Sequence, residues 1–243
     1  NKDIVSFNTF VKNNYKIMRL LEHKQFGSIE LKNSMVMAAM TRSRAEKNAM
    51  PTDLMLSYYQ QRSTAGLIIT EAINISEGAI GSPYTPGIYS QAQIDAWQQI
   101  TSAVHKNGGK IVAQLWHTGR VAHSIDRNNL LPVAPSAIAI EGLSHFTSQG
   151  LKPYERPKEL TIAEIEQIIS DYKQAALNAI AAGFDAVELH AANGYLPLQF
   201  FSDSANKRVD AYGGSIANKA RFIIEVLKAI IAAVGADRVG IKL

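Results

Sequence analysis

Short apolar runs alternate with longer amphipathic stretches along most of this chain. The runs are rich in Ile, Val or Leu and lack the apolar–polar alternation of a half-exposed strand, which predicts strands covered on both faces. These expected strands are Met35–Met40, Leu67–Thr70, Lys110–Trp116, Ala186–His190 and Val239–Leu243.

The stretches between the runs predict helices, because their apolar residues recur every three or four positions. Two of them open with the Ser/Thr-x-x-Glu/Gln signature of a capping box, at Ser90 and Thr161. Strand–helix alternation predicts a parallel sheet, and we expect about the first five strands of a TIM (β/α)8 barrel. The helices are expected over Thr52–Thr64, Ser90–Lys106, Thr161–Ala182 and Ser215–Val234.

Composition is that of a globular protein and limits the classes of function. Of the 243 residues, 47% are hydrophobic and 19% are charged, and the formal net charge is +4. No apolar run reaches the roughly 18 residues of a membrane span, and no nucleic-acid recognition motif is present. The opening residues lack the pattern of a signal peptide, and Cys is absent, so disulfides and thiolate chemistry are excluded. A cytoplasmic location is expected.

Candidate chemistry gathers at His190-Ala-Ala-Asn193-Gly-Tyr195, which begins at the last residue of the fourth expected strand. In parallel α/β folds, ligands bind at the carboxyl ends of the strands. A His, an Asn and a Tyr there can polarise a carbonyl oxygen and donate a proton beside it. A single buried His is more often structural than functional, so the interpretation depends on the three residues together. His105, His117 and His123 have no partner at metal-ligand spacing, and no metal site is expected.

From about residue 19 to the end, the chain resembles the Old Yellow Enzyme family of FMN-dependent ene-reductases, which are TIM barrels. The similarity is collinear, and the matching segments lie at strand ends. The resemblance is nearest to the N-ethylmaleimide and xenobiotic reductase group. The segments are VMAAMTRSRA (36–45), YYQQRSTAGLIITEA (58–72), PGIYS (86–90), AWQQITSAVHKNGGKIVAQLWHTGR (96–120), PVAPSAI (132–138), AGFDAVELHAANGYL (182–196), NKRVDAYGGSIANKARF (206–222) and DRVGIKL (237–243).

The resemblance implies that NADPH, or NADH, reduces FMN and that the flavin then reduces an activated alkene such as an enone, a maleimide or a nitro compound. By position, His190 and Asn193 would hold the substrate oxygen and Tyr195 would protonate carbon, with Trp116 and Tyr84 lining the substrate side. The implied cofactor-binding residues are Ala39, Met40, Thr41, Ala72, Gln114 and Lys242. Donors placed where charge develops would stabilise the transition state more than the ground state.

Two of the implied cofactor-binding positions depart from the family pattern, besides Val209, Ala217 and Pro197-Leu198 elsewhere. Ala39 replaces a usual Pro, and Lys242 replaces a usual Arg, which keeps the positive charge but loses the forked donor. The family's FMN phosphate is held by the last strands of the barrel, which have no counterpart here. We therefore expect a partial FMN-binding barrel domain over residues 19–243, preceded by an N-terminal extension over residues 1–18. The stretch KDIVSFNTFVKN (2–13) also resembles the family's final strand region, which would imply a rearranged chain.

Two other functions stay open on the sequence. The chain could be a catalytically incomplete fragment or non-enzymatic remnant, which would expose the edge of its last strand and self-associate. It could also be a Schiff-base aldolase with Lys242 as the nucleophile. The expected partners are small activated alkenes, with a homo-oligomer or a complementing C-terminal segment as further options.

Overall fold

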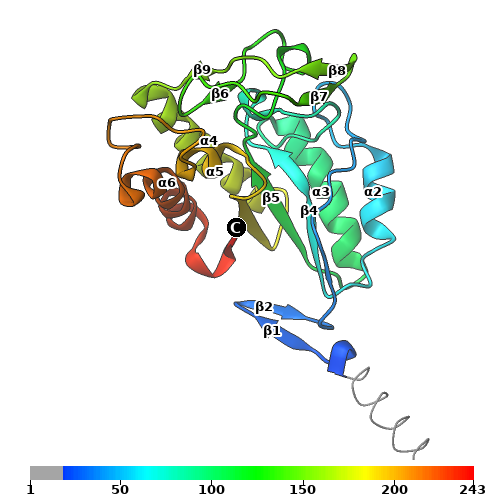
Figure 1. Cartoon of the computed structure of the whole chain (residues 1–243). Helices are drawn as coiled ribbons and strands as arrows, with labels where there is room; N and C mark the ends of the chain where they lie inside the picture. The colour runs from blue at the N-terminus through cyan, green and yellow to red at the C-terminus, as the bar shows by residue number, and fades with distance from the viewer. Residues whose placement is uncertain (1–18) are drawn as a thin grey trace, which may run out of the picture.

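The core of the molecule is a five-stranded, wholly parallel sheet (Figure 1). The computed structural model describes residues 19–243, so the predicted extension over residues 1–18 lies outside the described part. Neighbours in the sheet follow the order of the chain, as in a barrel that has been opened. The strands are β3 (Val36–Met37), β4 (Leu67–Asn74), β5 (Ile111–Trp116), β10 (Ala186–His190) and β11 (Val239–Lys242).

Four helices cover the outer face of the sheet and pack side by side in chain order. Their apolar stripes and the outward residues of β4, β5 and β10 form one buried cluster that includes Trp97, Tyr172 and Phe222. Both predicted capping boxes are present, at Ser90 and Thr161. The helices are α2 (Asp53–Gln60), α3 (Gln91–Lys106), α4 (Ile162–Ala181) and α6 (Ile216–Val234).

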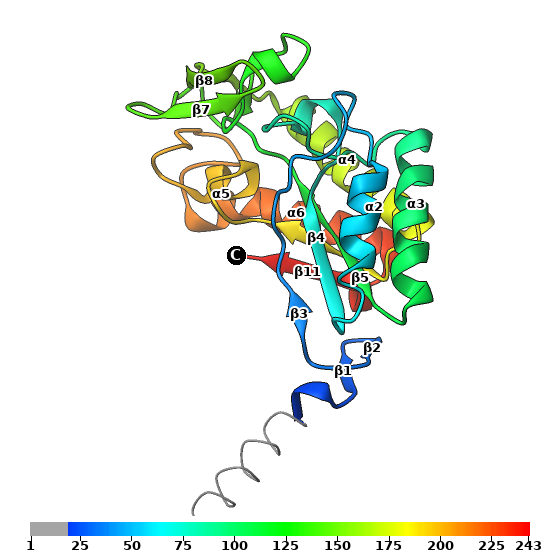
Figure 2. The same ribbon diagram turned by 90° about the vertical axis from the view of Figure 1, so that its right-hand side faces the viewer.

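The inner face of the sheet borders an apolar cavity of about 490 Å³, lined by Leu67, Ile69 and Val112 among others. At the amino ends of the strands, a hairpin of β1 (Lys24–Phe26) and β2 (Ile29–Leu31) packs against the same face (Figure 2). The expectation that every strand is covered on both faces is correct for β5, which is buried throughout, and wrong for β3 and β11. Those two strands form the edges of the sheet.

Two predicted strands differ from the structure by more than one residue. The first, expected over Met35–Met40, is reduced to the two residues of β3, because the chain leaves β4 after Met37. The second, expected to end at Thr70, continues to Asn74. Its polar residues interrupt the apolar pattern, but each has a buried hydrogen-bond partner, so the strand can carry them.

The long connection after β5 contains local structure that the pattern did not predict. A parallel pair of β6 (Val133–Ala134) and β9 (Lys158–Glu159) and an antiparallel hairpin of β7 (Ser144–Thr147) and β8 (Gly150–Pro153) rise above the carboxyl ends of the strands (Figure 1). A short helix, α5 (Leu196–Phe201), follows β10. These segments surround the end of the sheet at which the sequence places its chemistry.

Candidate functional site

Polar side chains form two successive rows across the carboxyl end of the sheet. In the lower row, Ala72, Gln114 and Glu188 are register partners on β4, β5 and β10. In the upper row, Asn74 is paired with Trp116, and His190 is paired with Lys242. The parallel register therefore brings together residues that lie up to about 170 positions apart in the chain.

His190 ends β10 as a buried, neutral imidazole. Its side chain is 4% exposed, and its Nδ1 accepts a hydrogen bond from the Ala192 amide at 3.3 Å. Burial, and then the charge of Lys242, lower the pKa of His190 to about 4. The remaining ring nitrogen, Nε2, thus carries the proton and can donate to a ligand.

Tyr195 stands between His190 and Trp116. Its ring meets the edge of each, with centroid distances of 4.9 Å to His190 and 5.0 Å to Trp116. The Trp116 indole donates to Asn74 Oδ1 at 2.8 Å, which fixes the wall against which Tyr195 rests. Burial, and to a lesser extent nearby Tyr154, raise the pKa of Tyr195, so its hydroxyl keeps its proton at neutral pH.

Asn193 and Lys242 lie at the open side of this cluster. Asn193 has a left-handed backbone (φ 58°) and an exposed side chain, and it lines a shallow pocket with Lys242 and Leu243. The structure brings His190, Tyr195 and Trp116 into contact and leaves Asn193 beside them, facing solvent. Lys242 is half-buried, and its carbonyl accepts from the Ala191 amide at 2.9 Å.

The lower row fits the hydrogen-bonding edge of a flavin ring. Gln114 is 2% exposed and donates one N–H to Glu188 at 2.6 Å. Within the described residues, its Oε1 has no hydrogen-bond partner, so it can accept from a ring N–H. Ala72 is the register partner of Gln114 and contributes only a methyl group to this row. The hydrogen-bonding groups of the lower row suit the ring of FMN, whereas no residue of the lower row carries a positive charge for its phosphate.

The remaining predicted site residues lie outside the two rows of side chains. Ala39, Met40 and Thr41 follow β3 in a segment without regular structure, and Met40 and Thr41 are exposed. Tyr84 has a φ of 59° and lines a cavity of about 270 Å³ together with Thr85, whose hydroxyl accepts from the Asn74 side chain that holds Trp116. The role of Tyr84 on the substrate side stays a prediction.

The fold and the position of these polar groups define the chain as part of a (β/α)8 barrel with a ligand site at the carboxyl ends of its strands. The chain belongs to the NADH:flavin oxidoreductase / NADH oxidase family, whose sequence profile matches residues 20–243. The resemblance to the Old Yellow Enzyme family is thereby confirmed, and so is the partial barrel.

Individual relatives agree with this assignment. The chain is 46% identical over 225 residues to 12-oxophytodienoate reductase 1 of Oryza sativa subsp. japonica, covering 92% of this chain and 58% of the relative. It is 44% identical over 223 residues to a probable flavin mononucleotide-dependent alkene reductase of Leishmania infantum, covering 89% and 61%. The chain therefore spans about three-fifths of the length of these relatives.

Solved structures show the same relationship. An old yellow enzyme homologue from Zymomonas mobilis superposes with a TM-score of 0.88 at 46% identity, covering 91% of this chain and 62% of that chain. Morphinone reductase in complex with tetrahydroNAD gives a TM-score of 0.86 at 47% identity, with coverages of 91% and 62%. Within residues 19–243, no helix is both long and apolar enough to cross a membrane.

Sequence reasoning missed several residues of the site. Asn74 and Glu188 hold Trp116 and Gln114, but each looks like an isolated polar residue in an apolar strand. Glu71, next to Ala72, is also buried, and burial raises its pKa to about 7. The one available signal was a polar residue inside an otherwise apolar run, which requires a partner when the strand is buried.

Proposed function

We propose that this chain carries the ring-binding and substrate-binding half of an FMN-dependent reductase of activated C=C bonds that uses NADPH or NADH. The observation that carries the proposal is the contact of His190, Tyr195 and Trp116 directly above the Ala72–Gln114–Glu188 row. Support comes from family membership and from a relative described as an alkene reductase.

His190 and Tyr195 would have different roles toward the substrate. The protonated Nε2 of His190 would donate to the carbonyl or nitro oxygen of an alkene, with Asn193 as a second donor from the open side. This oxygen gains negative charge during reduction, so a fixed donor lowers the barrier. The Tyr195 hydroxyl would then deliver its proton to the carbon beside that oxygen, because an enolate-like carbon is a far stronger base than a phenolate.

The ring of the cofactor would rest on the lower row. Gln114 would bond its pyrimidine edge, Ala72 and Ala39 would present backbone groups, and Thr41 and Lys242 would lie at opposite edges. Bound FMN would supply the hydride. Trp116, held by Asn74, would close the substrate side and exclude water.

Retention of FMN by the purified chain tests the proposal. We expect FMN to co-elute with the chain in gel filtration and the complex to consume NADPH in the presence of an enone or a maleimide. Glu77→Gln, a change at an exposed position outside the site, is the matched control and should behave like the wild type. A folded, colourless chain that does not retain FMN would instead support the incomplete-fragment alternative.

A further inference from the structure

A β-bulge interrupts β4 directly before Ala72. Ile69 is paired with Val112 and Ala72 with Gln114, so Thr70 and Glu71 together oppose the single residue Ala113. The Thr70 hydroxyl accepts from the Gln114 amide at 3.1 Å, replacing a bond that the ladder loses there. Bulges of this kind redirect side chains next to functional sites.

The extra residue reverses the alternation of side chains along β4. Ile69 lines the inner cavity, so in a regular strand Glu71 would share that face and Ala72 would point outward. With the bulge, Ala72 lies in the inner row beside Gln114, and Glu71 turns toward α2. The bulge thus places Ala72 on the inner face and Glu71 on the outer face.

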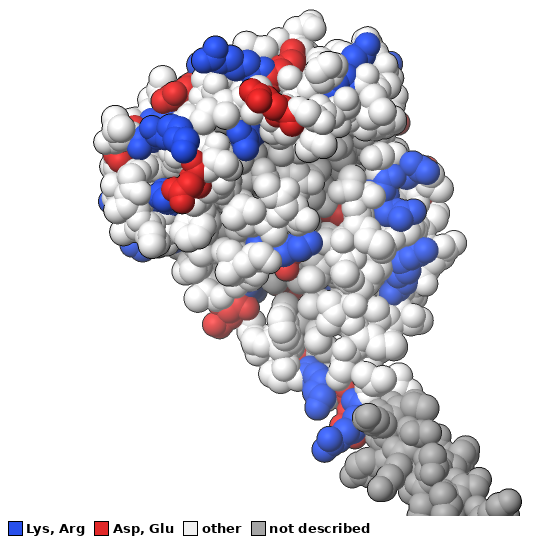
Figure 3. Space-filling view, in the orientation of Figure 1, with Lys and Arg blue, Asp and Glu red and all other residues white. Residues whose placement is uncertain are grey.

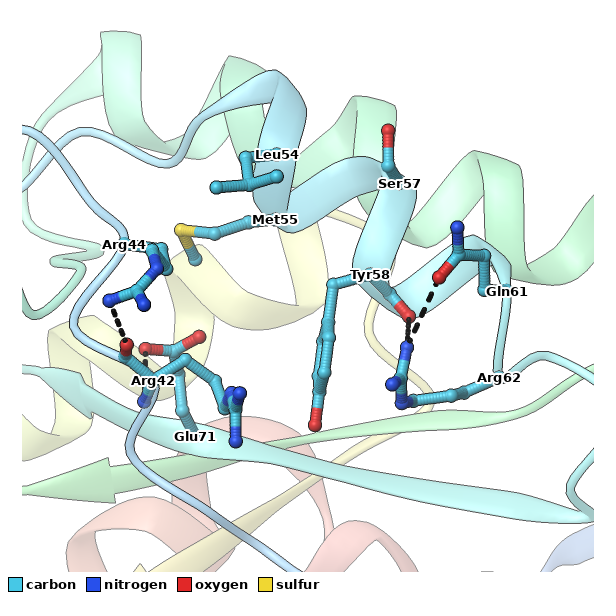
Figure 4. Close-up of a pocket in the computed structure, with 9 residues that line it drawn as sticks. All are labelled: Arg42, Arg44, Leu54, Met55, Ser57, Tyr58, Gln61, Arg62 and Glu71. Atoms are coloured by element: carbon cyan, nitrogen blue, oxygen red, sulfur yellow. Dashed lines mark hydrogen bonds between the residues drawn. The ribbon is translucent and has the colours of Figure 1, made fainter.

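Glu71 is held rigidly on the outer side. Its carboxyl accepts from the Tyr59 hydroxyl at 3.2 Å, and its amide donates to the same hydroxyl at 2.9 Å. Tyr59 itself is fully buried on α2. Figure 4 shows Glu71 at the base of a pocket between β4 and α2, with Arg42 and Arg44 close by.

The second carboxyl oxygen of Glu71 accepts from the backbone amide of Arg42 at 3.4 Å. Within the described residues, this is the hydrogen bond that ties the backbone of residues 38–43 to the sheet. The other hydrogen bonds of this segment come from the Arg44 guanidinium, which donates to the carbonyls of Arg42 and Ser43. Thr41 is the residue next to the tethered amide.

We propose that Glu71 is a positioning residue that anchors residues 38–43 through the Arg42 amide and so places Thr41 at the ring of the bound cofactor. The role of Thr41 rests on the proposed function, whereas the anchoring does not. The tether runs from α2 through Tyr59 and Glu71 to the segment, so its strength depends on the charge of one carboxyl.

That charge changes near neutral pH. Burial raises the pKa of Glu71 to about 7 against the lowering effect of the hydrogen bonds from Arg42 and Tyr59 and of the charges of Arg42 and Arg44. Above this pH the carboxylate is ionised, and hydrogen bonds to ionised acceptors are about twice as strong as neutral ones. The anchor is therefore stronger at pH 8 than at pH 6.

Amide hydrogen exchange of residues 38–44, followed by mass spectrometry from pH 6 to pH 8 and corrected for intrinsic rates, tests the anchor. We expect protection in the wild type to rise about fivefold with a midpoint near pH 7. Glu71→Gln should remove the rise, and Glu77→Gln should keep it. A flat wild-type profile, or a rise that survives in Glu71→Gln, would overturn the proposal. The wild-type profile decides the matter even if Glu71→Gln does not fold.

FMN titration at pH 8 separates this inference from the proposed function. Binding at least fivefold weaker in Glu71→Gln than in Glu77→Gln supports positioning at the cofactor, and equal affinity overturns it. Failure of the wild type to bind FMN would overturn the placement at the cofactor together with the proposed function. The anchoring itself would still stand or fall on the exchange profile.

Discussion

At the scale of single residues, environment decides which of two equally plausible roles a side chain takes. His117 follows β5 and His190 ends β10, and both are neutral because burial lowers their pKa, to about 3 and about 4. His190 has aromatic neighbours at the open end of the sheet, whereas His117 is fully enclosed near positively charged Arg127. His190 can therefore meet a ligand, whereas His117 is a structural residue.

Tyr195→Phe tests the proton donor. We expect alkene reduction to slow by on the order of 10²-fold, because the proton must then come from water, while cofactor reduction by NADPH is unchanged. The two half-reactions are measured separately by stopped-flow absorbance. Tyr154→Phe is the matched control, since it removes a neighbouring hydroxyl without a proposed proton role. Equal slowing of both half-reactions would contradict the assignment.

His190→Ala tests the oxygen-binding donor. Phenols imitate the substrate oxygen, so we expect their affinity for the FMN-bound chain to fall about tenfold when the Nε2 donor is removed. Titration followed by visible absorbance gives the dissociation constant. His105→Gln is the control, because His105 lies at the end of α3 and bonds Asp185 instead. Unchanged phenol affinity in His190→Ala would rule out this role.

At the scale of elements, local signals predicted where helices begin and long-range contacts set where strands end. Thr52, Ser90, Thr161 and Ser215 each cap the helix that follows, as their side chains alone suggest. The end of β4 depends instead on Asn74, whose side-chain amide donates to the Thr85 hydroxyl at 3.0 Å. Before β4, the Asn33 side-chain amide donates to the Thr64 carbonyl at 2.9 Å and draws two distant segments together. The pattern of residues within β4 cannot predict that contact.

Gly66→Ala tests this close approach. A Cβ at Gly66 would lie 2.0 Å from the Asn33 carbonyl oxygen, a backbone atom that cannot move aside without shifting β3 and β4. We expect a loss of about 2–3 kcal/mol in the free energy of unfolding, measured by urea denaturation. Gly78→Ala is the matched control, because the nearest atom to its Cβ would be 3.9 Å away. A loss equal to that of the control would contradict the packing.

At the scale of the whole molecule, buried titratable groups link stability to pH in opposite directions. His117 and His190 have folded pKa values below the usual 6.5, so the unfolded state binds more protons and stability falls as pH drops below about 6.5. In global unfolding, which transfers Glu71 to water, its folded pKa above the usual 4.5 favours the folded state at low pH, and this contribution is lost as pH rises through about 7. The hydrogen bond to the Arg42 amide responds in the opposite direction, because that bond lowers the pKa of Glu71. Between pH 8 and pH 5 the histidine and Glu71 contributions to global stability partly cancel.

Without the Glu71 carboxyl, the loss of stability caused by His117 and His190 at low pH should be larger. From pH 8 to pH 5, each histidine lowers the free energy of unfolding by on the order of 2 kcal/mol, and Glu71 raises it by a similar amount. We therefore expect the wild type to lose on the order of 1–2 kcal/mol over this range and Glu71→Gln to lose about 4 kcal/mol. Urea denaturation at both pH values measures the difference, with Glu77→Gln as the control. Parallel pH profiles for Glu71→Gln and the wild type would show that Glu71 titrates normally.

The charged side chains of the surface carry both signs. On the face shown in Figure 3, acidic and basic side chains are interspersed over most of the molecule, and basic ones are more frequent on the side where α2 lies. This face has no continuous basic surface. Neither the charge nor its distribution changes the function inferred from the site.

The sequence by itself determined the alternation of strands and helices, the helix caps and the position of His190 and Tyr195 at a strand end. Periodicity, helix caps and strand ends depend on residues that are close to one another in the sequence. Only the tertiary structure decided the bulge at Thr70–Glu71, the Gln114–Glu188 bond and the neutral state of His190. Each of these depends on residues from other elements, because burial and hydrogen bonding are set by neighbours in space.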